Sequence, residues 1–248
     1  MTYPMKPPRE AGAIGVLDLA GRAWLSLRGA APRLWPLWLA WAAVNGAAQY
    51  AGKALAKGDA DGLTSLPMLG FRAGLAVAGA VFGALTIRAV LGRGGRGLDK
   101  GFWIFLGLNG TAALGAGVLT AFAPSPGVEA AAAHPATMVG PLALSIGFLA
   151  GIWIALRLML WPVGALMGDA AMGPARSWRL MRGYLWRYVA AAALLGALPL
   201  LVAMVLSQEF YLHDQIVALV LGQPFLTFVA ATDAAVAAEL YRARSAAA

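Results

Sequence analysis

The chain has 248 residues, of which 60% are hydrophobic and 12% charged, and its formal net charge is +8. Soluble domains carry about 25% charged residues, so this composition argues against a water-soluble protein. There is no cysteine, which excludes disulfides, thiolate metal sites and cysteine nucleophiles. The basic residues flank apolar segments instead of forming one patch, and we therefore expect no nucleic-acid partner.

Long uncharged runs recur along the chain. They cover residues 34–52, 73–87, 101–128, 130–156, 188–208 and 215–232. A helix needs roughly 20 mostly apolar residues to cross a membrane; five runs reach that length directly, and the second does when it is extended to residues 71–91. None shows the polar stripe of a soluble helix or the short alternating segments of a barrel. The sequence predicts an all-α polytopic membrane protein with about six transmembrane helices.

The basic residues predict the orientation. Lys and Arg accumulate on the cytoplasmic side of membrane helices. If both termini are cytoplasmic, fifteen of the 19 basic residues lie inside: Lys6, Arg9, Arg22, Arg28, Arg33, Arg88, Arg93, Arg96, Lys100, Arg176, Arg179, Arg182, Arg187, Arg242 and Arg244. Only Lys53, Lys57 and Arg72 then lie outside, with Arg157 within a span. We expect a multi-pass protein of a bacterial inner (cytoplasmic) membrane, with no cleavable signal peptide because the first long run starts after residue 33.

Residues 14–30 differ from the first predicted span. Asp18, Arg22 and Ser26 recur at spacing four among apolar residues, and Asp18 and Arg22 can form an i,i+4 pair. Such a helix is typical of an interfacial anchor, and a docking helix for another protein is the alternative. Pro32 and Pro36 should break it before the first crossing. The expected organisation is a cytoplasmic N-terminus over 1–33, a transmembrane domain over 34–239 and a cytoplasmic tail over 240–248.

Small and polar residues lie within the spans. Small residues let membrane helices approach closely, and we assign this packing role to Gly79, Gly83, Gly107 and Gly115. Side chains that can hydrogen-bond between helices are those of Asn45, Gln49 and Asn109. Interhelical packing is the first interpretation, and a polar transport path is the alternative.

Three charged residues fall inside or near the predicted spans. A charge inside the membrane is costly unless it is paired, hydrated or reaches the interface. Arg157 comes late in the fourth run, and Asp233 and Glu239 approach the same inner side in the sixth. We expect an intramembrane ion pair of Arg157 with one of these acids, or an arginine that reaches the interface; a proton or substrate site is the alternative.

No pattern for catalysis or cofactor binding stands out. The two histidines, His134 and His213, lie in separate predicted loops and have no metal-site spacing. Nothing matches a P-loop, a nucleophile elbow or an HExxH motif. We expect no metal, no cofactor and no enzymatic activity.

The segment 153–186, WIALRLMLWPVGALMGDAAMGPARSWRLMRGYLW, is the most distinctive stretch. It resembles the membrane domain of glycerophosphoryl diester phosphodiesterases and related six-helix bacterial inner-membrane proteins. The matching positions are Arg157, Pro162, Ser177, Trp178, Arg179, Leu180, Arg182, Gly183 and Trp186, with Leu240, Tyr241 and Arg242 near the end of the chain. The resemblance implies a six-helix membrane domain that lacks the soluble, metal-binding catalytic domain, so activity does not carry over.

The same segment suggests lipid binding. If a helix begins at Pro174, favoured at the first helical position, then Arg176, Arg179, Gly183 and Arg187 share one face, and Arg182 lies close by. Arginine suits bidentate phosphate contacts, and basic pockets at the inner surface bind anionic headgroups. We predict a lipid-phosphate site at these five residues; orientation of the protein without specific lipid binding is the alternative.

Two functions are consistent with these features. The first is a non-catalytic scaffold or accessory subunit that interacts with membrane lipids, for which we expect anionic headgroups, and with a membrane-protein partner or another copy of itself. The second is a transporter or permease component for an amphiphilic or lipid-like substrate. A cavity that reaches the middle of the membrane would favour the second.

The charge asymmetry generates a topology prediction. Cysteines introduced after residues 60, 130 and 210 should react with an impermeant label from outside, and those after residues 96 and 175 only from inside. Cytoplasmic labelling after residue 130 would contradict the six-span arrangement, because that position separates two long runs.

Overall fold

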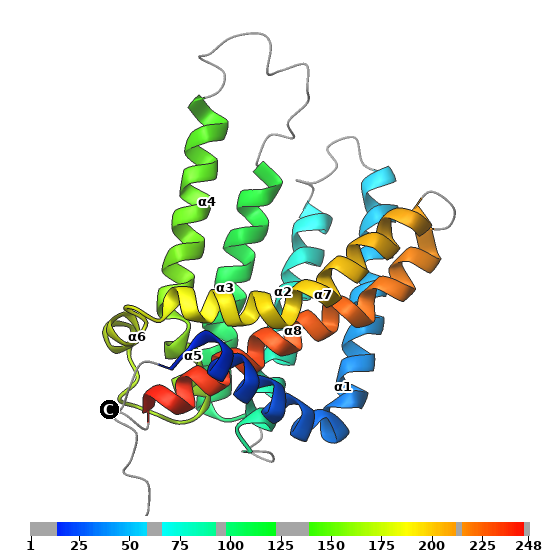
Figure 1. Cartoon of the computed structure of the whole chain (residues 1–248). Helices are drawn as coiled ribbons and strands as arrows, with labels where there is room; N and C mark the ends of the chain where they lie inside the picture. The colour runs from blue at the N-terminus through cyan, green and yellow to red at the C-terminus, as the bar shows by residue number, and fades with distance from the viewer. Residues whose placement is uncertain (1–13, 59–65, 93–97, 123–138, 212–214, 246–248) are drawn as a thin grey trace, which may run out of the picture.

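The computed structural model describes residues 14–58, 66–92, 98–122, 139–211 and 215–245, and these residues form helices without any strand (Figure 1). The helices are α1 (Val16–Gly58), α2 (Leu66–Val90), α3 (Lys100–Phe122), α4 (Val139–Leu158), α5 (Leu160–Leu166), α6 (Pro174–Leu180), α7 (Leu185–Tyr211) and α8 (Gln215–Ser245). The predicted all-α fold is confirmed for this part of the chain. In Figure 1, α2, α3 and α4 stand roughly upright, and α7 and α8 run obliquely across them.

Three helical segments among the described residues are long and apolar enough to cross a membrane. They are Ala73–Val90, Leu149–Leu166 and Leu185–Leu206. They overlap the second, fourth and fifth predicted spans, although Leu149–Leu166 shares only residues 149–156 with the fourth. The chain has the character of a membrane protein. The remaining predicted spans coincide with α1, α3 and α8, but the count of six stays a prediction.

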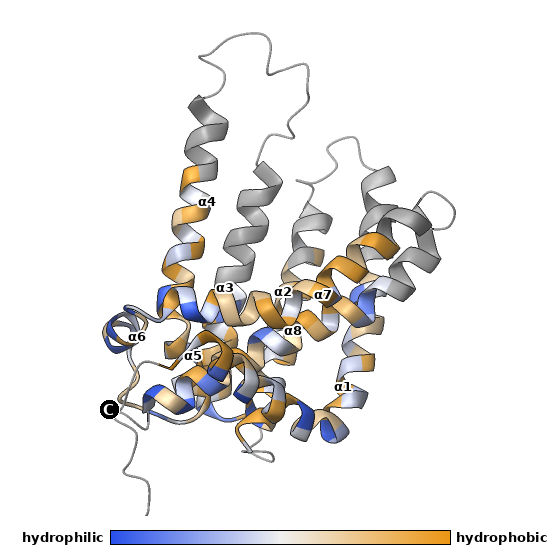
Figure 2. Ribbon diagram, viewed as in Figure 1, coloured by the Kyte–Doolittle hydropathy of each residue, from blue (hydrophilic) through white to orange (hydrophobic). Residues whose placement is uncertain are grey.

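The exposed surface of α7 fits contact with lipid. Trp186, Leu194, Leu198 and Leu201 are all more than half exposed. Figure 2 shows the described part of α7 largely in the hydrophobic colour, whereas hydrophilic residues gather around α6 and the C-terminal part of α8. A large exposed apolar face would be unfavourable in water but is neutral against lipid tails.

Helix α1 differs from the expected pair of separate elements. Pro32 and Pro36 lie inside one continuous helix, and Figure 1 shows it changing direction in its blue N-terminal third. This is a kink, the usual result when proline removes a hydrogen bond without ending the helix. Both predicted domain boundaries, 33/34 and 239/240, fall inside helices.

The first part of α1 packs against the protein. Leu19, Ala23 and Leu27 are fully buried in the core, and α1 lies along α8. Asp18 and Arg22 form the predicted i,i+4 ion pair at 2.9 Å on the exposed side. Because its main apolar stripe is buried within the chain, this segment is a packed helix, and its role as an interfacial anchor stays a prediction.

Residues 231–241 of helix α8 are almost all buried, and small residues allow this. Ala231, Ala235 and Ala238 have no exposed surface, so α7 and α1 can approach the α8 backbone closely. Further along α8, the amide of Asn45 donates a hydrogen bond of 2.8 Å to Gln223. Asn45 therefore bonds between helices as expected.

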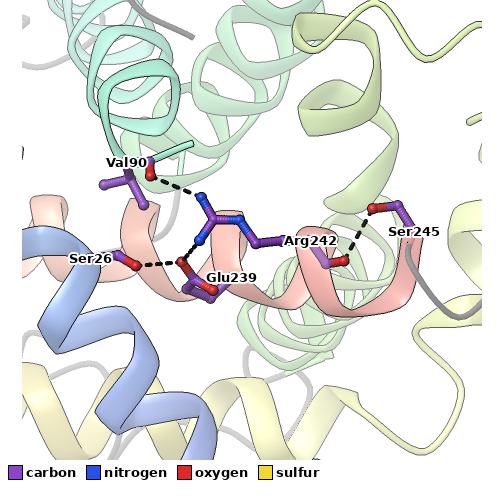
Figure 3. Close-up of polar contacts among 5 residues, drawn as sticks. All are labelled: Ser26, Val90, Glu239, Arg242 and Ser245. Carbon is purple, nitrogen blue, oxygen red and sulfur yellow. Dashed lines mark hydrogen bonds and ion pairs between the residues drawn. The ribbon is translucent and has the colours of Figure 1, made fainter. Parts of the chain in front are cut away.

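A polar cluster joins α1, α2 and α8 (Figure 3). Glu239 is only 4% exposed; it pairs with Arg242 and accepts a 2.5 Å hydrogen bond from the Ser26 hydroxyl. The second guanidinium nitrogen of Arg242 donates to the backbone carbonyl of Val90 at 3.1 Å. That carbonyl belongs to the last turn of α2, where no helical donor is available. One arginine thus pairs with a buried carboxylate and also donates a hydrogen bond to a backbone carbonyl at the end of α2.

A second ion pair orders the connection between α2 and α3. Arg88, buried in the last turn of α2, donates to Asp99 at 2.6 Å. The same Asp99 oxygen accepts the backbone N–H of Phe102 at 2.8 Å. Asp99 therefore caps the start of α3 while it neutralises Arg88.

The Glu239 cluster generates a stability prediction. Arg242→Gln should lower the free energy of unfolding by about 1–3 kcal/mol, because it leaves a buried carboxylate without its charged partner. Unfolding in mixed detergent micelles measures the loss. The matched control, Arg22→Gln, removes an exposed helix pair and should change stability by about 0.5 kcal/mol or less. Equal effects of the two variants would contradict the structural importance of the cluster.

Candidate functional site

The distinctive segment folds into a compact unit at the end of α4. The buried Ser177 of α6 donates a hydrogen bond of 3.0 Å to the backbone carbonyl of Arg157. The rings of Trp153 and Trp178 pack edge to face, with their centroids 5.0 Å apart. Residues of the two halves of the segment are therefore in direct contact.

Arg157 has aromatic neighbours instead of the expected acids. Its guanidinium lies 5.0 Å from the Trp153 ring centroid and 5.5 Å from that of Trp178. Glu239 pairs with Arg242, and the Tyr188 hydroxyl donates a hydrogen bond to Asp233. The expected ion pair of Arg157 with Asp233 or Glu239 is thus corrected. The physical reason is placement: α4 packs against α3, α5 and α6, whereas α8 packs mainly against α7 and α1.

The basic segment is not one helix. A helix does begin at Pro174, as predicted, but it ends at Leu180. Gly183 follows with φ of +83°, a left-handed conformation that favours glycine, and α7 begins only at Leu185. Arg176 and Arg179 on α6 are therefore separated from Arg187 on α7 by a turn. The predicted single face of Arg176, Arg179, Gly183 and Arg187 is wrong, because the turn redirects the chain.

Arg187 and Arg244 converge where the basic segment enters α7. The Tyr184 ring lies 5.0 Å from the guanidinium of Arg187 and 4.4 Å from that of Arg244. The Arg244 Nε atom is buried and has no hydrogen-bond acceptor among the described residues. Neither arginine forms an ion pair with a carboxylate in the part of the chain described. By contrast, Arg179 and Arg182 are exposed.

The predicted packing glycines divide into three cases. Gly79 lies against Trp41 of α1, where an added Cβ would be 3.4 Å from the ring, and Gly83 faces Phe105 of α3. Gly107 is exposed, and a Cβ added there would meet nothing within 4 Å, so its packing role is not supported among the described residues. Gly115 lies outside the residues whose surroundings are described.

Two further close approaches, one between helices and one between α5 and the connection to α6, occur at glycines that the spacing did not single out. A Cβ on Gly101 would collide with the backbone carbonyl of Ala165, and one on Gly164 would collide with Met172. Both glycines hold α5 against its neighbours, and neither belongs to a regular small-residue pattern.

A cavity of about 380 Å³ lies between α2, α3, α5, α7 and α8. Most of its wall is apolar, including Phe82 of α2 and Phe105 of α3. Its polar residues are Asn109, Tyr188 and Asp233. Asn109 donates to the carbonyl of Phe105 in its own helix at 3.0 Å, so it does not bond between helices. The Asp233 side chain remains accessible from the cavity, although Thr232 and Ala234 beside it are buried.

Sequence reasoning missed several of these residues. Tyr188 lies 45 residues from Asp233, and no local pattern links them. Tyr184 and Arg187 are three residues apart, a spacing that places them on adjacent positions of a helix, but nothing indicated that Arg244 would join them. Among the described residues, no group of three or more His, Asp or Glu side chains could hold a metal ion.

No protein-family model, curated protein or solved structure matches this chain. The resemblance of segment 153–186 to the phosphodiesterase membrane domain therefore stays a prediction.

The surroundings of Arg157 generate a prediction about coupling. In a double-mutant cycle, Arg157→Met and Trp178→Leu should show a coupling energy of about 0.5–2 kcal/mol, the range of cation–π contacts. The matched cycle of Arg157→Met with Glu239→Gln should show coupling below about 0.5 kcal/mol, because the two residues have separate partners. Strong coupling to Glu239, measured by unfolding in detergent, would restore the originally expected pair.

Proposed function

We propose that this protein is a non-catalytic membrane protein that binds an anionic phospholipid headgroup at Arg187 and Arg244. The observation that carries the proposal is the convergence of both guanidinium groups on the Tyr184 ring, with no carboxylate partner for either among the described residues. Each guanidinium lies within 5.0 Å of the same ring centroid, and a phosphate that contacts either of them would balance its charge while it accepts bidentate hydrogen bonds.

The surroundings of this pair favour a lipid as the source of the phosphate. Trp186 is 77% exposed on the neighbouring turn of α7, and tryptophan is enriched at the level of membrane headgroups. The exposed apolar face of α7 extends from the same end, where acyl chains of a bound lipid could lie. An assembly partner within the membrane would use the same apolar face, which supports the role of a scaffold or accessory subunit.

Transport of an amphiphilic substrate is the second candidate. The cavity beside Asp233 favours this function, since a scaffold that carries no substrate needs no such space. Under both proposals the protein lies in a bacterial inner membrane with both termini in the cytoplasm. This orientation rests on the distribution of basic residues alone.

Lipid retention tests the first proposal. The double variant Arg187→Gln with Arg244→Gln should retain at least about ten-fold less co-purified phosphatidylglycerol or cardiolipin than the unmodified protein. Each cation near an anionic headgroup contributes about 1 kcal/mol to the binding free energy. Native mass spectrometry of protein released from mild detergent measures the bound lipid.

The matched control removes the same charge from the exposed pair, as Arg179→Gln with Arg182→Gln. It should keep the lipid, although membrane orientation can suffer. If the control loses the lipid and the Arg187/Arg244 variant keeps it, the headgroup site belongs to the exposed arginines of the basic segment. Equal retention in all three proteins would reduce these residues to an orientation signal.

A further inference from the structure

The cavity between α2, α3, α5, α7 and α8 contains an unbalanced negative group. Its volume of about 380 Å³ lies within the range of small-molecule sites, roughly 300–1,000 Å³. Asp233 supplies the single carboxylate of the lining, and no Lys, Arg or His is among the residues that line the cavity. Among the described residues, the lining therefore places a titratable acid beside a mostly apolar wall without a cation next to it.

Tyr188 holds this carboxylate in place. The buried Tyr188 hydroxyl donates to one oxygen of Asp233, and this is the only hydrogen bond or ion pair of that carboxylate among the described residues. A carboxylate accepts about four hydrogen bonds through its two oxygens. The second oxygen is therefore available to a ligand inside the cavity.

The lining also has the composition that recognises organic cations. Phe82 and Phe105 line the same space as Asp233, and aromatic rings attract ammonium groups. Small residues such as Ala80, Gly83 and Ala234 shape the rest of the wall, which leaves room for an apolar body. A carboxylate in such a wall repels an anion and gives a neutral hydrocarbon no advantage.

We propose that this cavity is a binding site for a small organic cation: an ammonium group with an apolar body, whose charge is balanced by Asp233. The geometry assigns Asp233 the counter-charge, Tyr188 the orientation of the carboxylate, and the phenylalanines the contact with the apolar body. The site shares no residue with the headgroup site at Arg187 and Arg244 and stands or falls separately from it. It deepens the transport candidate by naming the substrate class.

Binding of benzyltrimethylammonium to the full chain in lipid nanodiscs, followed by titration calorimetry, tests the proposal. Two competitors share its benzyl group: neopentylbenzene, its uncharged carbon isostere, and benzylsulfonate, which is anionic. We expect the cation to bind and each competitor to bind at least about ten-fold more weakly, because only the cation pairs with the carboxylate. Absence of cation binding, or equal binding of cation and isostere, would overturn the proposal.

Variants locate the site. Asp233→Asn preserves the side-chain shape and should weaken cation binding by about ten-fold or more, whereas the matched control Asp18→Asn removes an exposed carboxylate elsewhere and should leave it unchanged. Gly83→Ala should be tolerated by the fold, since its Cβ would lie 3.9 Å from Phe105, an ordinary contact. It should weaken binding of the cation because it narrows the cavity. Unchanged affinity in Asp233→Asn would place the cation elsewhere. If that variant does not fold, the comparison of the three probes on the unmodified protein still decides the outcome.

Discussion

The burial of Glu239 is the constraint on which the arrangement of the helices depends. A carboxylate with 4% exposure is costly unless charge and hydrogen bonds replace its water. Ser26 from α1 and Arg242 from the next turn of α8 provide both. Because Arg242 also bonds to the last turn of α2 through Val90, the positions of three helices are coupled. Moving any one of them would leave a polar group desolvated without a partner.

This constraint fixes α8, and α8 in turn carries a residue of each candidate site. Asp233 lies toward the cavity and Arg244 lies against Tyr184, with the Glu239 cluster between them along the helix. The two sites have opposite chemistry. Among the described residues, one has a carboxylate without a cation in its lining, and the other has two cations without a carboxylate partner.

Close packing rather than hydrophobic exclusion holds the helices together in such an environment, since lipid tails are as apolar as the side chains they would replace. The alanines of α8 and the glycines at positions 101 and 164 serve this purpose. They bring backbones within contact distance, where many weak dispersion contacts add up. Gly183 has a different role: its positive φ forms the turn between α6 and α7, which places Tyr184 and Arg187 next to the end of α8.

The sequence by itself determined the helical class, the helix start at Pro174 and the local Asp18–Arg22 pair. These properties depend on composition and on residues within one or two turns, so periodicity and spacing reveal them. The tertiary structure alone decided that Arg157 lies over Trp153 and Trp178, that Glu239 pairs with Arg242, and that Tyr188 reaches Asp233. A helical pattern shows which residues share a face but not which helix that face meets, and a glycine such as Gly183 is compatible with either a continuing helix or a turn. Partners separated by 45 residues, as Tyr188 and Asp233 are, or by 213, as Ser26 and Glu239 are, are set by packing of whole helices, because a side chain can reach only the neighbours that packing brings within a few ångströms.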